Sequence, residues 1–134
     1  MASKGIALKL LSLIPLLSLL GCQRLAEVKI VQANNGQIQI ETSLKGDRNP
    51  CVLGLTIEHM SGSKRVTNWM ISLDSERRDK CVNTFTYPNI PPHYHLIGKP
   101  RPLKEGQTYN VSVDGAGFRG GDVFTRINLP RRMP

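Results

Sequence analysis

The chain has 134 residues, with 18 Lys and Arg against 10 Asp and Glu, for a formal net charge of +8. This length leaves room for one domain only. The basic balance suits an acidic protein or an anionic surface as partner. Aromatic residues make up 5% of the chain, too few to supply the stacking platforms of a protein that binds single-stranded nucleic acid.

The chain begins like a secretory signal. Lys4 and Lys9 lie in a start without acidic residues, and an uncharged apolar run extends from Leu10 to Leu20. This order is typical of a cleaved signal peptide, and the run is shorter than the roughly twenty apolar residues of a spanning helix. The alternative is a buried N-terminal helix. We therefore predict that residues 1–21 are a signal peptide and that the domain is kept away from nucleic acid.

Leu19-Leu20-Gly21-Cys22 closes the apolar run and resembles the lipobox of bacterial lipoproteins. The resemblance implies cleavage after the small Gly21 and a diacylglycerol thioether on Cys22. Leu20 is bulkier than the residue most often found at its position. Two or three acyl chains would give a stable membrane anchor. By the same resemblance, Gln23 after the cysteine implies the outer membrane, with the domain facing the periplasm. Loss of Lys4 and Lys9 lowers the formal net charge from +8 to +6.

Two cysteines, Cys51 and Cys81, remain once Cys22 is assigned to lipid. In an oxidising compartment outside the cytoplasm we expect them to form a disulfide. Such a bond would stabilise the fold by roughly 3–4 kcal/mol on the chain-entropy model. The alternatives are two buried free thiols or a metal site, although neither cysteine has a second one nearby at ligand spacing.

Alternation of apolar and polar residues predicts strands from residue 27 onward, after a short tether of residues 22–26. Residues 27–32 and 37–43 should form a hairpin around the turn signal Asn34-Asn35-Gly36. Two further strands follow at residues 51–58 and 66–73. Their expected inward faces are Cys51, Leu53, Leu55 and Ile57 on the first, and Trp69, Ile71 and Leu73 on the second.

In the second half of the chain, the sequence pattern predicts shorter strands. Residues 74–80 are interpreted as a solvated loop, because each acid there has a basic neighbour. Three prolines exclude central pairing for the stretch after residue 87. Strands are expected at residues 82–87, 93–98, 109–113 and 123–129, with a Gly-rich turn at 115–121. Residues 27–134 are thus predicted to form an all-β domain, a small β-sandwich of seven or eight strands with immunoglobulin-like architecture.

Three residues are candidates for contact with a partner. The Gly-rich turn should present Phe118 and Arg119 at its tip, and aromatic and Arg side chains dominate binding hot spots. Arg126 belongs to a set of basic residues in the C-terminal third: Lys99, Arg101, Lys104, Arg119, Arg126, Arg131 and Arg132. The turn does not indicate a phosphate loop, because a strand rather than a helix follows it.

Metal binding and catalysis are less favoured. His93 and His95 would share one face of a strand, as ligands of Zn or Cu can, but His59 is the only other histidine. The alternative is an exposed loop edge, and we expect neither a metal nor a cofactor. No Ser-His-Asp or paired-carboxylate arrangement stands out, so no catalytic residue is assigned.

A second resemblance concerns function. The lipobox, the β-only domain, the Cys pair and the stretch Leu-Lys-Glu-Gly-Gln-Thr-Tyr-Asn-Val-Ser-Val at residues 103–113 are similar to small enterobacterial immunity lipoproteins of type VI secretion systems. The resemblance implies a periplasmic binder that blocks a toxic effector, and a basic domain would suit an acidic effector. The alternatives are a structural or assembly accessory lipoprotein of an envelope or secretion complex, and an enzyme.

Overall fold

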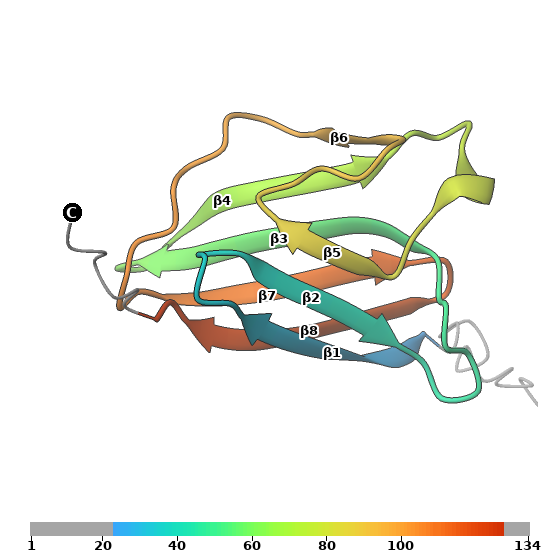
Figure 1. Cartoon of the computed structure of the whole chain (residues 1–134), viewed down its shortest axis with the longest axis horizontal. Coiled ribbons are helices and arrows are strands. Elements are labelled where there is room, and N and C mark those ends of the chain that lie inside the picture. The colour runs from blue at the N-terminus through green and yellow to red at the C-terminus, as the bar shows by residue number, and fades with distance from the viewer. Residues whose placement is uncertain (1–22, 128–134) are drawn as a thin grey trace, which may run out of the picture.

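The computed structural model describes residues 23–127. The expected signal peptide, Cys22, Arg131, Arg132 and the end of the last expected strand lie outside the described residues. The described part contains eight strands and one short 3-10 helix (Figure 1): β1 Arg24–Gln32, β2 Ile38–Ser43, β3 Val52–Ser61, β4 Lys64–Leu73, η2 Arg78–Lys80, β5 Thr84–Tyr87, β6 Tyr94–Leu96, β7 Thr108–Gly115 and β8 Phe118–Thr125. The all-β prediction is confirmed.

All eight strands belong to one sheet, in the order β5-β2-β1-β8-β7-β3-β4-β6. β1 connects the two halves of the sheet, because its first residues pair with one neighbouring strand and the rest pair with another. Arg24–Ala26 pair in parallel with Phe118–Gly120 of β8, whereas the rest of β1 pairs antiparallel with β2. At this switch the sheet curls, so that β2 and β5 form a second layer, drawn in front of β7 and β3 (Figure 1).

The core lies between these layers. Aromatic rings join them edge to face: Trp69 of β4 contacts Tyr87 of β5 at a centroid distance of 5.4 Å, and Phe85 of β5 contacts Tyr94 of β6 at 5.3 Å. Strict alternation of buried and exposed residues is observed in β2 and β7, as predicted. The buried apolar residues are Ala26, Val28, Ile38, Ile40, Val52, Leu55, Ile57, Trp69, Ile71, Leu73, Phe85, Tyr94, Tyr109, Val111, Val113, Phe118 and Phe124.

The expected tether is shorter than residues 22–26, because β1 begins at Arg24. The Arg24 amide donates a hydrogen bond of 3.0 Å to the carbonyl of Gly117, and Ala26 is buried. Ala26 lies so close to Gly120 of β8 that a Cβ at Gly120 would overlap the Ala26 carbonyl. The domain therefore starts within three residues of Cys22.

The inward face expected at the start of β3 was wrong. The register between β3 and β7 shifts between Val52 and Gly54, which is the signature of a β-bulge. The shift turns Val52 into the core, while Leu53 is only half-buried. Leu55 and Ile57, beyond the bulge, point inward as predicted.

The Gly-rich turn predicted at residues 115–121 is present but was predicted too long. β7 runs on to Gly115 and β8 begins at Phe118, so that Ala116 and Gly117 alone form the turn. Gly117 has a φ of 78°, a conformation that glycine adopts without strain. The expected start of the last strand at residue 123 is therefore five residues late.

Candidate functional site

The curled sheet has two different ends. The end where the described residues begin, named the anchor end after the predicted lipid on Cys22, is formed by the beginning of β1, the β7–β8 turn and η2 (Figure 1). The far end contains the β3–β4 turn, residues 97–107 and the end of β8. The nine residues of β1 run from one end to the other, which corresponds to about 30 Å at about 3.3 Å per residue.

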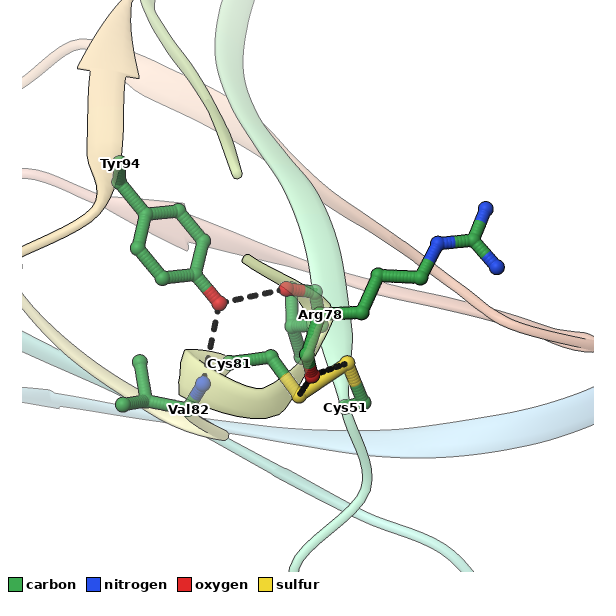
Figure 2. The surroundings of a disulfide bond; sticks show 6 residues. Cys51, Arg78, Cys81, Val82 and Tyr94 are labelled. Atoms are coloured by element: carbon green, nitrogen blue, oxygen red, sulfur yellow. Dashed lines mark hydrogen bonds between the residues drawn. A yellow bond between two sulfur atoms is a disulfide. The ribbon is translucent and has the colours of Figure 1, made fainter. Parts of the chain in front are cut away.

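The anchor end contains the predicted disulfide (Figure 2). Cys51, just before β3, is bonded to Cys81, which lies before β5, with a Cα–Cα distance of 5.2 Å. The hydroxyl of Tyr94 lies beside this bond. It donates to the Val52 carbonyl at 2.6 Å and accepts from the Val82 amide at 3.0 Å. Burial raises the pKa of Tyr94, and the hydrogen bond from Val82 opposes this shift.

The far end carries an apolar groove of about 350 Å³ between the layers. Its lining residues are Trp69, Tyr87, Pro88, Ile90, Leu96, Pro100, Arg101 and Pro102. Trp69 is buried at the base, and Ile90 is 41% exposed. Burial raises the pKa of Tyr87, and the charge of Arg126 opposes this shift. The groove thus combines aromatic and aliphatic surface with a guanidinium group.

A second depression, the polar pocket, lies next to the groove and shares Arg101 and Pro102 with it. Its volume is about 290 Å³, and its other lining residues are His59, Ser61, Val66, Asn68, Lys104, Gln107 and Tyr109. The Arg101 amide donates to the Asn68 carbonyl at 2.7 Å, which fixes the loop against β4. Arg101 therefore lies between the two depressions.

Cationic side chains predominate at the far end. Among residues 23–127, the far end contains two acids, Glu58 and Glu105, and six cations: Lys64, Arg65, Lys99, Arg101, Lys104 and Arg126. Glu58 pairs with Arg65 at 3.4 Å. The surplus of four positive charges gives this end a field that attracts acidic partners.

The three predicted contact residues are not brought together. Phe118 is 2% exposed, so its prediction as a contact residue was wrong. It is the first residue of β8, and its ring covers Gly115 so closely that a Cβ there would overlap it. Arg119 is exposed near the anchor end, with its Nε 2.9 Å from Asp114 Oδ1. Arg126 lies at the far end, where its charge acts on Tyr87.

The three histidines differ in backbone conformation and in side-chain partners. His93 precedes β6 and has a φ of 68°, so the strand geometry that would align it with His95 is absent there. His95 Nδ1 lies 2.7 Å from Asp74 Oδ1, and His59 Nδ1 lies 2.6 Å from Asn68 Oδ1. Within residues 23–127, no group of three His, Cys, Asp or Glu residues is placed to hold a metal ion.

Sequence reasoning missed the groove and the pocket, apart from counting Arg101 and Lys104 among the basic residues. The groove forms only when Trp69 of β4 meets Tyr87 of β5 across the layers. The available signal was the density of prolines around residues 88–92 and 100–102, which marks rigid loops. In the part of the chain that the structure describes, no helix is long and apolar enough to span a membrane. No protein-family model, curated protein or solved structure matched the chain.

Proposed function

We propose that this protein is an outer-membrane lipoprotein, anchored through Cys22 and facing the periplasm, that protects its cell by binding and blocking a type VI secretion effector. The observation that carries the proposal is that the candidate binding surface and the start of β1 lie at opposite ends of the domain. β1 begins at one end, two residues after Cys22, and the groove and the cationic surplus lie at the other end. An anchored domain would hold that surface about 30 Å into the periplasm.

The apolar groove has the composition of a protein-binding hot spot. Trp, Tyr and Arg are the residue types that contribute most to protein interfaces, and the groove contains Trp69, Tyr87 and Arg101. Ile90 adds exposed apolar surface that a partner would bury. The neighbouring cations would speed the approach of an acidic effector and favour it over basic proteins.

The groove is also preorganised, which lowers the entropic cost of binding a partner. The Asn89 amide donates to the Thr86 carbonyl at 2.8 Å and so fixes the loop after β5. On the opposite wall, the amides of Ile97 and Arg101 donate to carbonyls of β4 at 2.8 and 2.7 Å. Little loop ordering would therefore oppose binding.

The alternative, an accessory lipoprotein that captures partners by strand addition, has less support. The two edge strands of the sheet are β5, with four residues, and β6, with three. Pro88 follows the first, and Pro91 and Pro92 precede the second. Short edges bounded by proline offer few free backbone groups for an added strand.

A competition experiment tests the proposal. The gene is deleted from its bacterium, and the deletion strain is grown in contact with the parent strain, whose type VI secretion system is intact. We expect the parent to kill the deletion strain, and a plasmid copy of the gene to restore survival. Survival of the unprotected deletion strain at the parental level would overturn the proposal.

Complementation with variants tests the surface. Ile90→Asp places a charge in the groove and should abolish protection while the melting temperature stays unchanged. Val123→Asp changes a similarly exposed residue on β8, 55% exposed against 41% for Ile90, and should protect fully. Equal protection by both variants would exclude the groove as the binding surface.

A further inference from the structure

Asn68 is a buried polar residue placed at the polar pocket by an irregularity in the sheet. Ile57 of β3 pairs with Trp69, but Glu58 pairs with Thr67, so Asn68 is an extra residue on β4. Bulges of this kind redirect a side chain, and here Asn68 and Trp69 are both turned inward. Asn68 is 3% exposed and lines the pocket.

The hydrogen bond between Asn68 and His59 sets which groups face a ligand. Asn68 Oδ1 lies 2.6 Å from His59 Nδ1. A carboxamide oxygen accepts only, so the ring nitrogen donates, and the Asn68 amide group keeps both N–H donors. The His59 ring is held in turn by an edge contact with Tyr109, at a centroid distance of 5.7 Å.

Two cations are positioned at the same pocket by backbone hydrogen bonds. The Lys104 amide donates to the Tyr109 hydroxyl at 2.7 Å, and the Arg101 amide donates to the Asn68 carbonyl at 2.7 Å. Both bonds end on residues of the pocket wall. The backbones of Arg101 and Lys104 are therefore held in place beside Asn68.

The described residues that line the polar pocket are rich in donors and include no carboxylate. Asn68 offers an amide, Arg101 a guanidinium and Lys104 an ammonium group. A cationic ligand would find no anion among these residues. A carboxylate could accept hydrogen bonds from the amide, the guanidinium and the ammonium group. Arg in particular presents a planar pair of donors that matches a carboxylate. The volume of about 290 Å³ lies near the lower limit for ligand pockets and suits a single side chain.

We infer that the polar pocket binds the carboxylate of an Asp or Glu side chain on the protein partner, with an apolar neighbour of that residue in the groove across Arg101. The inference depends on the proposed function only in that the partner is a protein. A phosphate of a lipid headgroup is the other source of such an anion. The pocket lies at the far end, about 30 Å from the start of β1 by the length of that strand, and so away from the membrane that would hold Cys22.

Peptide binding to the purified, micelle-bound lipoprotein tests the inference. The probe is acetyl-Gly-Glu-Leu-Gly-amide, and the matched control peptide carries Gln in place of Glu. We expect the Glu peptide to shift the Asn68 side-chain amide signals in a saturable manner, with an affinity at least tenfold higher than that of the Gln peptide. Equal affinities would overturn the inference. Shifts produced by inorganic phosphate alone, and not by the Glu peptide, would also overturn it.

Variants locate the binding and separate this inference from the proposed function. Asn68→Asp keeps the shape of the side chain but places a carboxylate in the pocket, and Arg101→Gln removes the guanidinium. Each should weaken binding of the Glu peptide at least tenfold, while Arg119→Gln at the anchor end should not. Unaltered affinity in both pocket variants would overturn the pocket assignment, even if the competition experiment shows protection. Conversely, Glu-dependent binding without protection would leave the pocket assigned and contradict only the immunity function.

Discussion

The hydroxyl of Tyr94 donates to the Val52 carbonyl at 2.6 Å, so the edge strand β6 is tied to the start of β3. The same hydroxyl accepts from the Val82 amide at 3.0 Å. The Val52 amide donates to the Val82 carbonyl at 3.2 Å, and Cys51 and Cys81 are bonded immediately before these two residues. One phenol and one disulfide thus join three segments of the chain at the anchor end.

Replacement of Tyr94 by Phe removes this hydroxyl and keeps the ring that packs on Phe85. The Val52 carbonyl then loses a short hydrogen bond in a buried position, which should lower the free energy of unfolding by about 1–3 kcal/mol. Urea unfolding under oxidising conditions measures the change. An unchanged unfolding midpoint would show that the hydroxyl contributes nothing to holding β6.

The same variant should change the response to alkaline pH. The pKa of Tyr94 is raised in the folded protein, mainly by burial. Stability from the neutral phenol is therefore fully present below the unfolded pKa of about 10 and is lost as pH rises through the folded pKa. The melting temperature of Tyr94→Phe should fall less between about pH 9 and about pH 11 than that of the unmodified protein. The pKa of Tyr87 is also raised, so ionisation of Tyr87 should still lower the melting temperature of the variant over this range. Parallel curves would contradict the role of Tyr94.

The disulfide predicts a redox-dependent stability. Cys51→Ser should lower the free energy of unfolding by roughly 3–4 kcal/mol when both proteins are measured without a reductant, because the unfolded chain regains a loop of thirty residues. With a strong reductant present the two proteins should unfold at nearly the same urea concentration. A difference that persists in reductant would assign the effect to side-chain packing rather than to the covalent bond.

Phe118 should behave as a core residue. Phe118→Ala removes a ring that is 2% exposed, and the cavity should lower the free energy of unfolding by about 3–5 kcal/mol. Arg119→Ala, the adjacent exposed residue, should change it by no more than about 0.5 kcal/mol. Guanidinium unfolding of both variants provides the comparison. Comparable values for the two would mean that Phe118 is not packed in the core.

Local sequence patterns predicted those elements whose burial follows a strict alternation. β2 and β7 are such strands, since every second residue of each faces the core. The cysteine pair could also be predicted, because one cysteine was assigned to lipid and the other two had no alternative partner. These features depend on residues close together in the sequence or on simple counting.

The missed features depend on contacts between distant segments. The bulge that turns Val52 inward is defined by pairing with β7, some sixty residues later. The first half of β8 escaped prediction because Gly120 and Gly121 have no side chains to show a pattern. Gly120 is required by the close approach of Ala26 from β1. The groove likewise depends on the contact between Tyr87 and Trp69. The polar pocket depends on the hydrogen bond from the Arg101 amide to β4.

The proposed anchor at Cys22 would decide which end of the domain faces an incoming protein, and mass spectrometry of the polypeptide extracted from outer membranes tests it most directly. We predict a chain that begins at residue 22, with a diacylglycerol thioether on its sulfur and a fatty acid on its amine. A chain that still begins at Met1, or that carries a free thiol at position 22, would contradict the anchored orientation.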